Sequence, residues 1–119
     1  MKKLLPTSTA GSLPKPTWLA EPEKLWSPWK LEGKALLDGK QDALRVSLQE
    51  QLAAGIDIVS DGEQTRQHFV TTFIENLSGV DFENKKTVRI RDRYDANVPG
   101  VIGPVSRQKS VFVEDAKFL

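Results

Sequence analysis

The chain has 119 residues, enough for one modest domain. Hydrophobic residues make up 39% and charged residues 28% of it, a balance typical of a globular chain and not of a disordered one. The formal net charge of +1 gives no reason to expect a nucleic-acid partner or an acidic membrane surface. There is no cysteine and one histidine, His68, which excludes a cysteine-ligated or multi-histidine metal site built from these residues alone.

The N-terminus resembles the start of a secretory signal over residues 1–5, but its apolar part stops at Pro6. A signal peptide needs an apolar core of about 7–15 residues. No apolar run approaches the roughly 20 residues that span a bilayer. We therefore expect a cytoplasmic protein with no membrane partner.

Residues 3–9 predict a short strand that ends in a turn of small residues at 10–12. Four prolines and three tryptophans follow within residues 13–33. Because proline breaks helices and indole rings favour burial, this stretch predicts an ordered loop whose tryptophans cover the end of a core. A binding platform is the alternative.

An amphipathic helix is predicted from Asp38, as the N-cap, to Gly55, as the C-terminal cap. Its apolar face would carry Leu44, Leu48 and Leu52. Residues 56–60 are rich in β-branched side chains and predict a buried strand, and residues 61–63 predict the next turn. A second helix is predicted from Phe69 to Leu77, closed by Gly79. The alternation of strands and helices predicts a parallel sheet.

Residues 80–82 and 87–91 alternate apolar and polar side chains around residues 84–86, which predicts a surface hairpin. Residues 101–105 predict a third core strand. Glu114 and Asp115 predict the acidic first turn of a last helix. Since that helix has hardly begun when the sequence ends, we expect the chain to be the N-terminal part of something longer.

Ligands of parallel α/β proteins bind in the loops that follow the carboxyl ends of the strands. Three such loops are predicted, at residues 10–12, 61–63 and 106–110. Gly11 permits close backbone approach, and Ser12 offers a hydroxyl and an N–H group to a ligand. Glu63 has the charge to bind a substrate ammonium. Ordinary explanations compete: a tight turn for Gly11 and Ser12, and a helix-start acid for Glu63.

Other charged residues are weaker candidates. The third loop carries Arg107 and Lys109, which either bind an anionic group or are simply solvated. Arg66 either pairs with Glu63 or faces solvent, and His68 is more typical of a structural residue than of a catalytic one. Acidic neighbours offset the basic residues around the predicted hairpin, which favours a solvated surface. These basic residues are Lys85, Lys86, Arg89, Arg91 and Arg93. The sequence contains no phosphate-binding glycine motif and no serine-hydrolase elbow.

Three segments, in order and with fitting spacing, resemble the catalytic barrel of cobalamin-independent methionine synthases. They are residues 5–12 (LPTSTAGS), 61–70 (DGEQTRQHFV) and 101–106 (VIGPVS). The short N-terminus is similar to that of the compact single-barrel members. The resemblance implies an α/β fold in which residues 1–119 form the N-terminal portion of one incomplete (β/α)8 TIM barrel, with about three parallel strands and a surface hairpin.

The resemblance also implies a function, the zinc-assisted transfer of a methyl group to the thiol of homocysteine to give methionine. Ala10, Gly11 and Ser12 are then expected to hold the amino-acid substrate, and Glu63 its ammonium. No catalytic residue and no metal ligand is expected within this segment, because the family's zinc ligands lie in the later half of the barrel. A folate-contacting segment of the family aligns loosely with residues 93–99, which makes Arg93 the expected methyl-donor contact. The donor stays open between a methylated folate, a corrinoid and a small methylated partner.

Three other functions stay open on the sequence. They are a methyltransferase acting on another thiol, a relative of uroporphyrinogen decarboxylase, and a non-catalytic truncated product that oligomerises or binds a partner. Three strands out of eight cannot close a barrel, and an unclosed sheet exposes an edge and an apolar face. We therefore expect the 119-residue chain to be inactive by itself.

Overall fold

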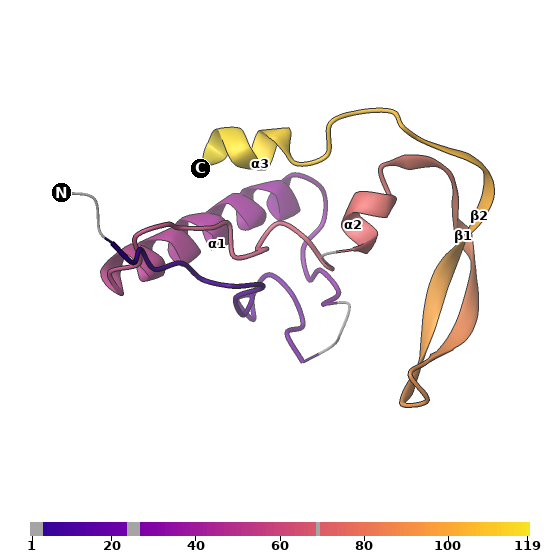
Figure 1. The fold of residues 1–119 in the computed structure, drawn as a ribbon, viewed down its shortest axis with the longest axis horizontal. Helices are drawn as coiled ribbons and strands as arrows, with labels where there is room; N and C mark the ends of the chain where they lie inside the picture. Colours follow the sequence, from indigo (N-terminus) through magenta and orange to yellow (C-terminus); the bar gives the residue numbers. More distant parts are fainter. Residues whose placement is uncertain (1–3, 24–26, 69) are drawn as a thin grey trace. The chain divides into compact units, whose positions relative to one another are not determined.

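The computed structural model of the protein describes residues 4–23, 27–68 and 70–119 (Figure 1). Lys3, Trp26 and Phe69 lie outside the described residues, so the predictions are compared with the structure without them. The chain divides into two compact units, the first comprising residues 1–69 and 114–119 and the second residues 70–113. No helix of the described residues is long and apolar enough to cross a membrane.

Helix α1, Gly33–Ala53, is the longest element of the first unit (Figure 1). It begins earlier than predicted, after Glu32, whose side chain makes no capping hydrogen bond with the described residues. The prediction of Asp38 as N-cap is wrong, because Asp38 lies inside the helix and pairs with Lys34 one turn before it. The good helix formers between these two residues extend the helix towards the N-terminus.

The buried face of α1 consists mostly of small and polar residues, and not of the predicted row of leucines. Leu44 is buried, whereas Leu48 is half-buried and Leu52 is exposed. A Cβ atom on Gly39 would lie only 3.3 Å from Leu19 Cδ1, so the loop before the helix packs directly against the helix backbone. The residues that recur at four-residue intervals along this face are Gly39, Ala43, Ser47 and Gln51.

The predicted C-terminal cap of α1 is confirmed. Gly55 has a φ of 74°, a left-handed conformation that glycine adopts without a Cβ penalty. Its N–H donates to the Leu52 carbonyl at 3.0 Å, and the Ile56 N–H donates to the Gln51 carbonyl at 3.0 Å. These two bonds form a Schellman motif.

The proline- and tryptophan-rich stretch is an ordered loop over its described residues, as predicted, but Trp18 is 47% exposed and so covers a core only in part. Ala20 and Trp29 form an antiparallel bridge, and the Lys30 N–H donates to the Leu19 carbonyl at 2.9 Å. Leu19 and Ala20 are fully buried. The Trp29 ring lies under the ammonium of Lys40 from α1, at 4.5 Å.

The first two predicted strands run parallel and side by side, but they pair at one position only. Ser8 and Ile58 form an isolated parallel bridge, in which the Ile58 N–H donates to the Thr7 carbonyl at 2.9 Å. The Asp57 carboxylate accepts hydrogen bonds from the N–H and the hydroxyl of Thr7, each at 2.9 Å. The predicted parallel sheet of about three strands is therefore not formed among the described residues.

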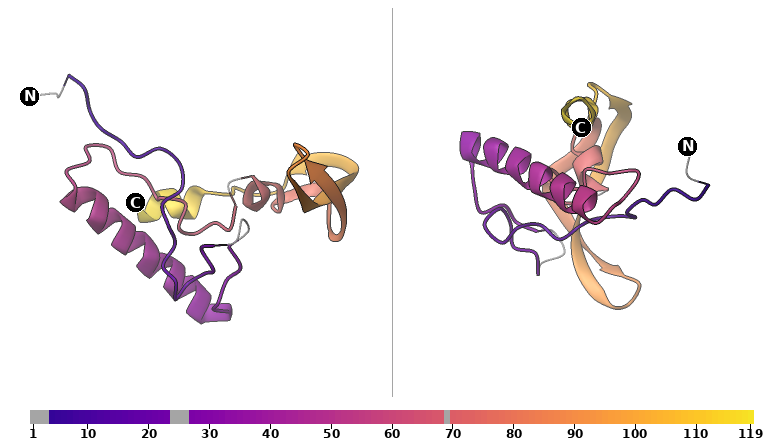
Figure 2. Two further views of the ribbon diagram at one scale, coloured as in Figure 1. Left: turned by 90° about the horizontal axis from the view of Figure 1, so that it is seen from below. Right: turned by 90° about the vertical axis from the view of Figure 1, so that its left-hand side faces the viewer.

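The second unit is built on a long antiparallel hairpin of β1, Leu77–Ile90, and β2, Tyr94–Arg107, which coil about one another (Figures 1 and 2). The chain reverses at Arg91 and Asp92, whose φ values of 50° and 55° define a type I′ turn. The predicted turn at residues 84–86 is wrong. There the Asp81 carboxylate accepts hydrogen bonds from the Glu83 and Asn84 N–H groups, at 2.9 and 3.0 Å, and a break in the strand register forms instead.

Two further predictions fail in this unit. The predicted helix over residues 69–77 is reduced to the single turn of α2, Thr71–Ile74, because Leu77 already belongs to β1. The predicted third core strand lies within β2, where Val101 and Ile102 are 72% and 74% exposed. Its backbone N–H and C=O groups form antiparallel hydrogen bonds with β1, as in the pairing of Val80 with Val101, and are therefore not available to a parallel sheet.

The last helix forms as predicted, as α3, Val113–Phe118, with two acidic residues in its first turn. Within the first unit, Asp115 accepts a hydrogen bond from the Thr65 hydroxyl at 3.1 Å. The Arg45 guanidinium of α1 lies 5.1 Å from the centre of the Phe118 ring.

Candidate functional site

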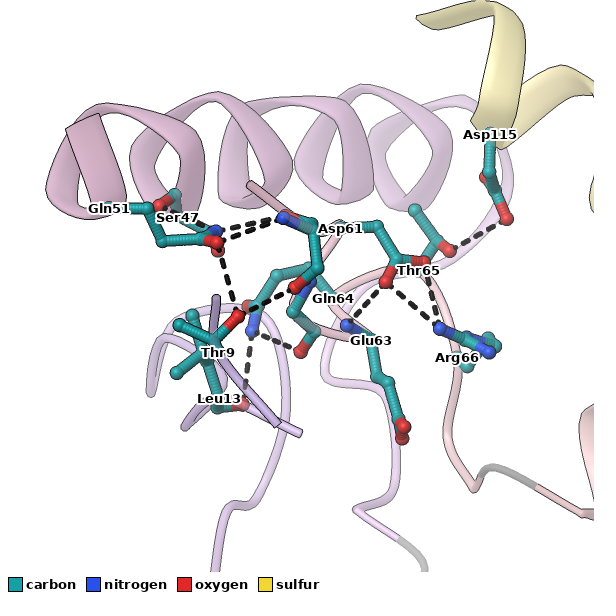
Figure 3. A network of polar contacts seen from close by, with 12 residues as sticks. Thr9, Leu13, Ser47, Gln51, Asp61, Glu63, Gln64, Thr65, Arg66 and Asp115 are labelled. Carbon is teal, nitrogen blue, oxygen red and sulfur yellow. Dashed lines mark hydrogen bonds and ion pairs between the residues drawn. The ribbon is translucent and has the colours of Figure 1, made fainter. Parts of the chain in front are cut away.

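Two of the three predicted ligand loops meet in the first unit. We call residues 10–15 the first loop and residues 60–66 the second loop. The Leu13 N–H donates to the Gly62 carbonyl at 3.0 Å, and the Gln64 amide nitrogen donates to the carbonyls of Leu13 and Gly62 at 3.0 and 3.1 Å (Figure 3). Ser12 precedes Leu13 in the chain, and Glu63 lies between Gly62 and Gln64, so both are adjacent to residues that make these hydrogen bonds. The structure thus brings together the loops that carry them.

The buried side chain of Gln51 on helix α1 binds Thr9, directly before the first loop, and Ser60, the first residue of the second loop. Its amide oxygen accepts a hydrogen bond from the Ser60 N–H at 2.9 Å, and its amide nitrogen donates to the Ser60 carbonyl at 2.9 Å. The Thr9 hydroxyl donates to the same amide oxygen at 3.2 Å and lies 2.9 Å from the Ser60 hydroxyl (Figure 3). The two short parallel segments share one backbone bridge only, and the side chain of Gln51 supplies further hydrogen bonds that hold them together.

Glu63 has a strained backbone. Its φ of 57° lies in the left-handed region, which costs a non-glycine residue about 1–2 kcal/mol. The strain is held by Asp61, which accepts the Glu63 N–H at 3.0 Å and pairs with the Arg66 guanidinium at 2.8 Å. Both side chains of this ion pair are 17% exposed. Arg66 thus pairs with Asp61, which was not predicted, and such strain is typical of functional sites.

Gly62 lets the second loop lie close to α1. Its φ is 56°, and a Cβ atom there would stand 2.7 Å from the Ser47 hydroxyl oxygen and 3.0 Å from Leu13 Cδ1. Both distances are shorter than ordinary van der Waals contact. Glycine is therefore required for the conformation and for the packing.

The first loop lines two neighbouring cavities, and the second loop contributes Gln64 to one of them. One of about 350 Å³ has Ser12, Lys15 and Ser27 among its polar lining residues. The other, of about 360 Å³, extends to α1 and includes Lys15, Glu50 and Gln64. These volumes lie at the lower end of the range of small-molecule sites, roughly 300–1,000 Å³.

Lys15 is the site residue that sequence reasoning missed. It is 9% exposed, and burial lowers its pKa while the charge of Glu63 raises it. A lysine rarely becomes buried without a partner. The available signal was its position between two prolines, three residues after the Gly11-Ser12 turn.

The remaining predicted residues of the first unit lie around this junction. Ala10, Gly11 and Ser12 are exposed, and Gly11 has a φ of 75° that glycine tolerates. His68 is half-buried, and burial lowers its pKa while the charge of Glu63 raises it. The Glu63 charge therefore acts on both Lys15 and His68.

The other basic candidates belong to the second unit. Arg93 is exposed and completes the hairpin turn, with its N–H donating to the Ile90 carbonyl at 2.9 Å. Arg89 pairs with Asp95 at 3.2 Å, as expected for a charge-compensated surface. Arg107 ends β2 and Lys109 follows it, both exposed.

The described residues do not provide a zinc site. In the described part, no group of three or more His, Cys, Asp or Glu side chains is placed to hold a metal ion. Of the acidic residues in the second loop, Asp61 is already engaged by Arg66 and by the Glu63 N–H. The implied zinc ion therefore receives no ligand set from the described residues.

Two adjoining loops follow the carboxyl ends of parallel segments, one with a carboxylate and one with a buried ammonium, and this is where α/β proteins place their ligand sites. A family model described as the catalytic domain of cobalamin-independent synthase matches residues 5–118. Because this match covers nearly the whole chain, the protein belongs to the family of cobalamin-independent synthase catalytic domains.

Individual relatives agree with the family assignment. The methionine synthases of Sulfolobus acidocaldarius and Saccharolobus solfataricus are 31% and 30% identical to this chain over 115 residues, 97% of its length. A solved B12-independent methionine synthase from a Shewanella species, in complex with selenomethionine, is 80% identical with a TM-score of 0.90 and covers 98% of this chain. The chain spans only 33%, 34% and 34% of these three proteins, about a third of each.

Proposed function

We propose that the chain supplies the amino-acid-binding part of a cytoplasmic, cobalamin-independent methionine synthase. In this reaction the homocysteine sulfur forms a bond to a methyl group, the bond between that methyl group and its donor breaks, and the thiol proton is lost. We further propose that residues 1–119 are the N-terminal segment of one (β/α)8 barrel. The parallel bridge between Ser8 and Ile58 supports this, because it has the strand direction that such a barrel requires.

The main observation behind the proposal is that the Glu63 carboxylate makes no hydrogen bond or ion pair with the described residues. The Glu63 side chain extends away from the polar network around it (Figure 3). Its backbone is nevertheless held in a strained conformation by Asp61. A carboxylate that is held in a strained backbone and has no partner among the described residues is suited to bind a ligand cation.

The other site residues complete the binding of the amino acid. Glu63 accepts hydrogen bonds from the substrate ammonium, while the hydroxyl and N–H of Ser12 donate to the substrate. Ala10 and Gly11 allow the backbone to approach it closely. Zinc, which activates the thiol in this family, would take its ligands from outside this chain. A methylated folate or a corrinoid would donate the methyl group, with Arg93 as its contact.

The test uses a hybrid enzyme, the Shewanella methionine synthase with this chain in place of its corresponding third. Methionine and homocysteine are titrated calorimetrically into the hybrid, with and without zinc. Glu63→Gln is expected to weaken methionine binding about 10- to 100-fold, the value of hydrogen bonds to a charged group. Glu32→Gln, on an exposed residue of the same unit, should bind like the unsubstituted hybrid.

Two results would contradict the proposal. If the hybrid fails to bind methionine while its Shewanella parent binds it, this chain does not perform the role of the segment it replaces. If Glu63→Gln binds methionine as tightly as the unsubstituted hybrid, the ammonium is bound elsewhere.

A further inference from the structure

We infer that Lys15 binds the carboxylate of the amino-acid ligand, so that the site holds the two charges of the ligand between Lys15 and Glu63. The inference rests on the proposed function and adds a residue to it. Neither the sequence motifs nor the resemblance to the family gives Lys15 a role.

The first argument is the burial of this lysine. Lys15 is only 9% exposed, and within residues 4–23, 27–68 and 70–119 no hydrogen bond or ion pair is made by its ammonium group. Removing an ammonium from water is unfavourable unless a partner compensates it. A bound anion would supply the compensation that the described residues do not.

The second argument is a buried acceptor in one of the same cavities. The amide nitrogen of Gln64 is committed to the carbonyls of Leu13 and Gly62, which leaves its Oε1 atom as an acceptor. That atom is buried and has no hydrogen-bond partner in the described structure, and Gln64 is 1% exposed. Buried polar atoms without partners are rare. Lys15 and Gln64 line one cavity, so the buried lysine lies beside a polar side chain whose hydrogen-bonding capacity is also not fully used by the described residues.

The third argument concerns the choice of ligand group. In an α-amino acid the ammonium and the carboxylate share one carbon atom, so a protein that binds both needs opposite charges close together. The charge of Glu63 raises the pKa of Lys15 against the larger effect of burial, which means that the two charges interact. The hydrogen bond from Leu13 to Gly62 holds the two loops together. Arg66, the other nearby cation, is already paired with Asp61.

The cavity of about 350 Å³ also includes Glu23, whose carboxylate would repel an anion. Glu23 is exposed, so water screens its charge more strongly than that of buried Lys15. Ser12 and Lys15 line the same cavity and both donate hydrogen bonds. The ligand carboxylate therefore lies beside Ser12 and Lys15 in this cavity, away from Glu23.

The test compares three ligands of the hybrid enzyme by calorimetry at about pH 6, where an α-amino group is protonated. They are methionine, methioninamide, which lacks the carboxylate charge, and 4-(methylthio)butanoate, which lacks the ammonium. Lys15→Met should weaken methionine binding about tenfold or more, since a charge-assisted hydrogen bond is lost, and leave methioninamide binding unchanged. Lys15→Arg should retain the preference for methionine over methioninamide, and exposed Lys34→Met serves as the control.

Folding is checked separately by the melting temperature of each variant. Because Lys15 is buried without a described partner, Lys15→Met should melt at the same or a higher temperature, so weaker binding would not report unfolding. If Lys15→Met keeps the full preference for methionine over methioninamide, the inference is overturned. The proposed function still stands in that case, provided Glu63→Gln loses the preference for methionine over 4-(methylthio)butanoate. If the unsubstituted hybrid does not bind methionine, both are overturned.

Discussion

The junction of the two loops depends on Gly62, and Gly62→Ala tests it most directly. An alanine would have to adopt the φ of 56°, which costs about 1–2 kcal/mol in the left-handed region. Its Cβ would also stand 2.7 Å from the Ser47 hydroxyl oxygen and 3.0 Å from Leu13 Cδ1. Overpacking of this kind costs typically 1–3 kcal/mol. We expect the free energy of unfolding to fall by about 2–5 kcal/mol, the sum of these two effects.

Gly55→Ala is the matched control for the backbone contribution. Gly55 belongs to the same unit and has a φ of 74°, but a Cβ atom there would meet nothing within 4 Å. Its cap is made by backbone groups, which alanine retains. Gly55→Ala should therefore cost only about 1–2 kcal/mol. The difference between the two variants isolates the crowding of Ser47 and Leu13.

Urea unfolding of the chain and of both variants measures these free energies. Methionine titration into the hybrid enzyme then measures the effect on the site. The Gly62 carbonyl accepts hydrogen bonds from the Leu13 N–H and from the Gln64 amide, so displacing Gly62 should separate the loops and weaken methionine binding. If Gly62→Ala lowers the free energy of unfolding no more than Gly55→Ala does, the side chains of Leu13 and Ser47 move aside without cost. The two loops are then not tightly packed at Gly62.

Two further predictions concern Gln51 and His68. Gln51→Leu should cost about 2–6 kcal/mol in the free energy of unfolding, because it leaves the N–H and C=O groups of Ser60 without their partner at about 1–3 kcal/mol each. Leucine at exposed Gln49 should stay within about 0.5 kcal/mol, and equal losses in the two variants would contradict the role of Gln51. Burial lowers the pKa of folded His68 below the ordinary 6.5, so the unfolded chain takes up the proton first and stability should fall as the pH drops below that value. Urea midpoints measured against pH should decline less in His68→Gln, and identical profiles would show that His68 does not contribute.

Sequence reasoning succeeds where contacts between near neighbours in the chain decide the structure. The Gly55 cap forms because its two hydrogen bonds join residues at the end of one helix. The last helix begins at its acidic residues, which the positive end of the helix dipole stabilises. In both cases a few consecutive residues contain all the partners.

Predictions fail where two local solutions compete and distant pairing decides between them. The sequence predicts the hairpin turn around residues 84–86, yet the Asp81 carboxylate binds the backbone there and the reversal occurs at Arg91 and Asp92. The strand predicted over residues 101–105 exists, but pairing with β1 makes it part of an exposed hairpin. Which partner a strand takes depends on the whole register and is not contained in its own residues.

The candidate site shows the same division. The sequence by itself determined the residue types at the strand ends, and these types are sufficient to make Ser12 and Glu63 candidates. Only the tertiary structure decided that their loops meet, through Leu13 and Gly62, and that Lys15 is buried beside them. The physical reason is that burial and charge proximity are properties of the volume around a residue. Segments about fifty positions away in the chain create that volume, as the hydrogen bond from Gln64 to Leu13 shows.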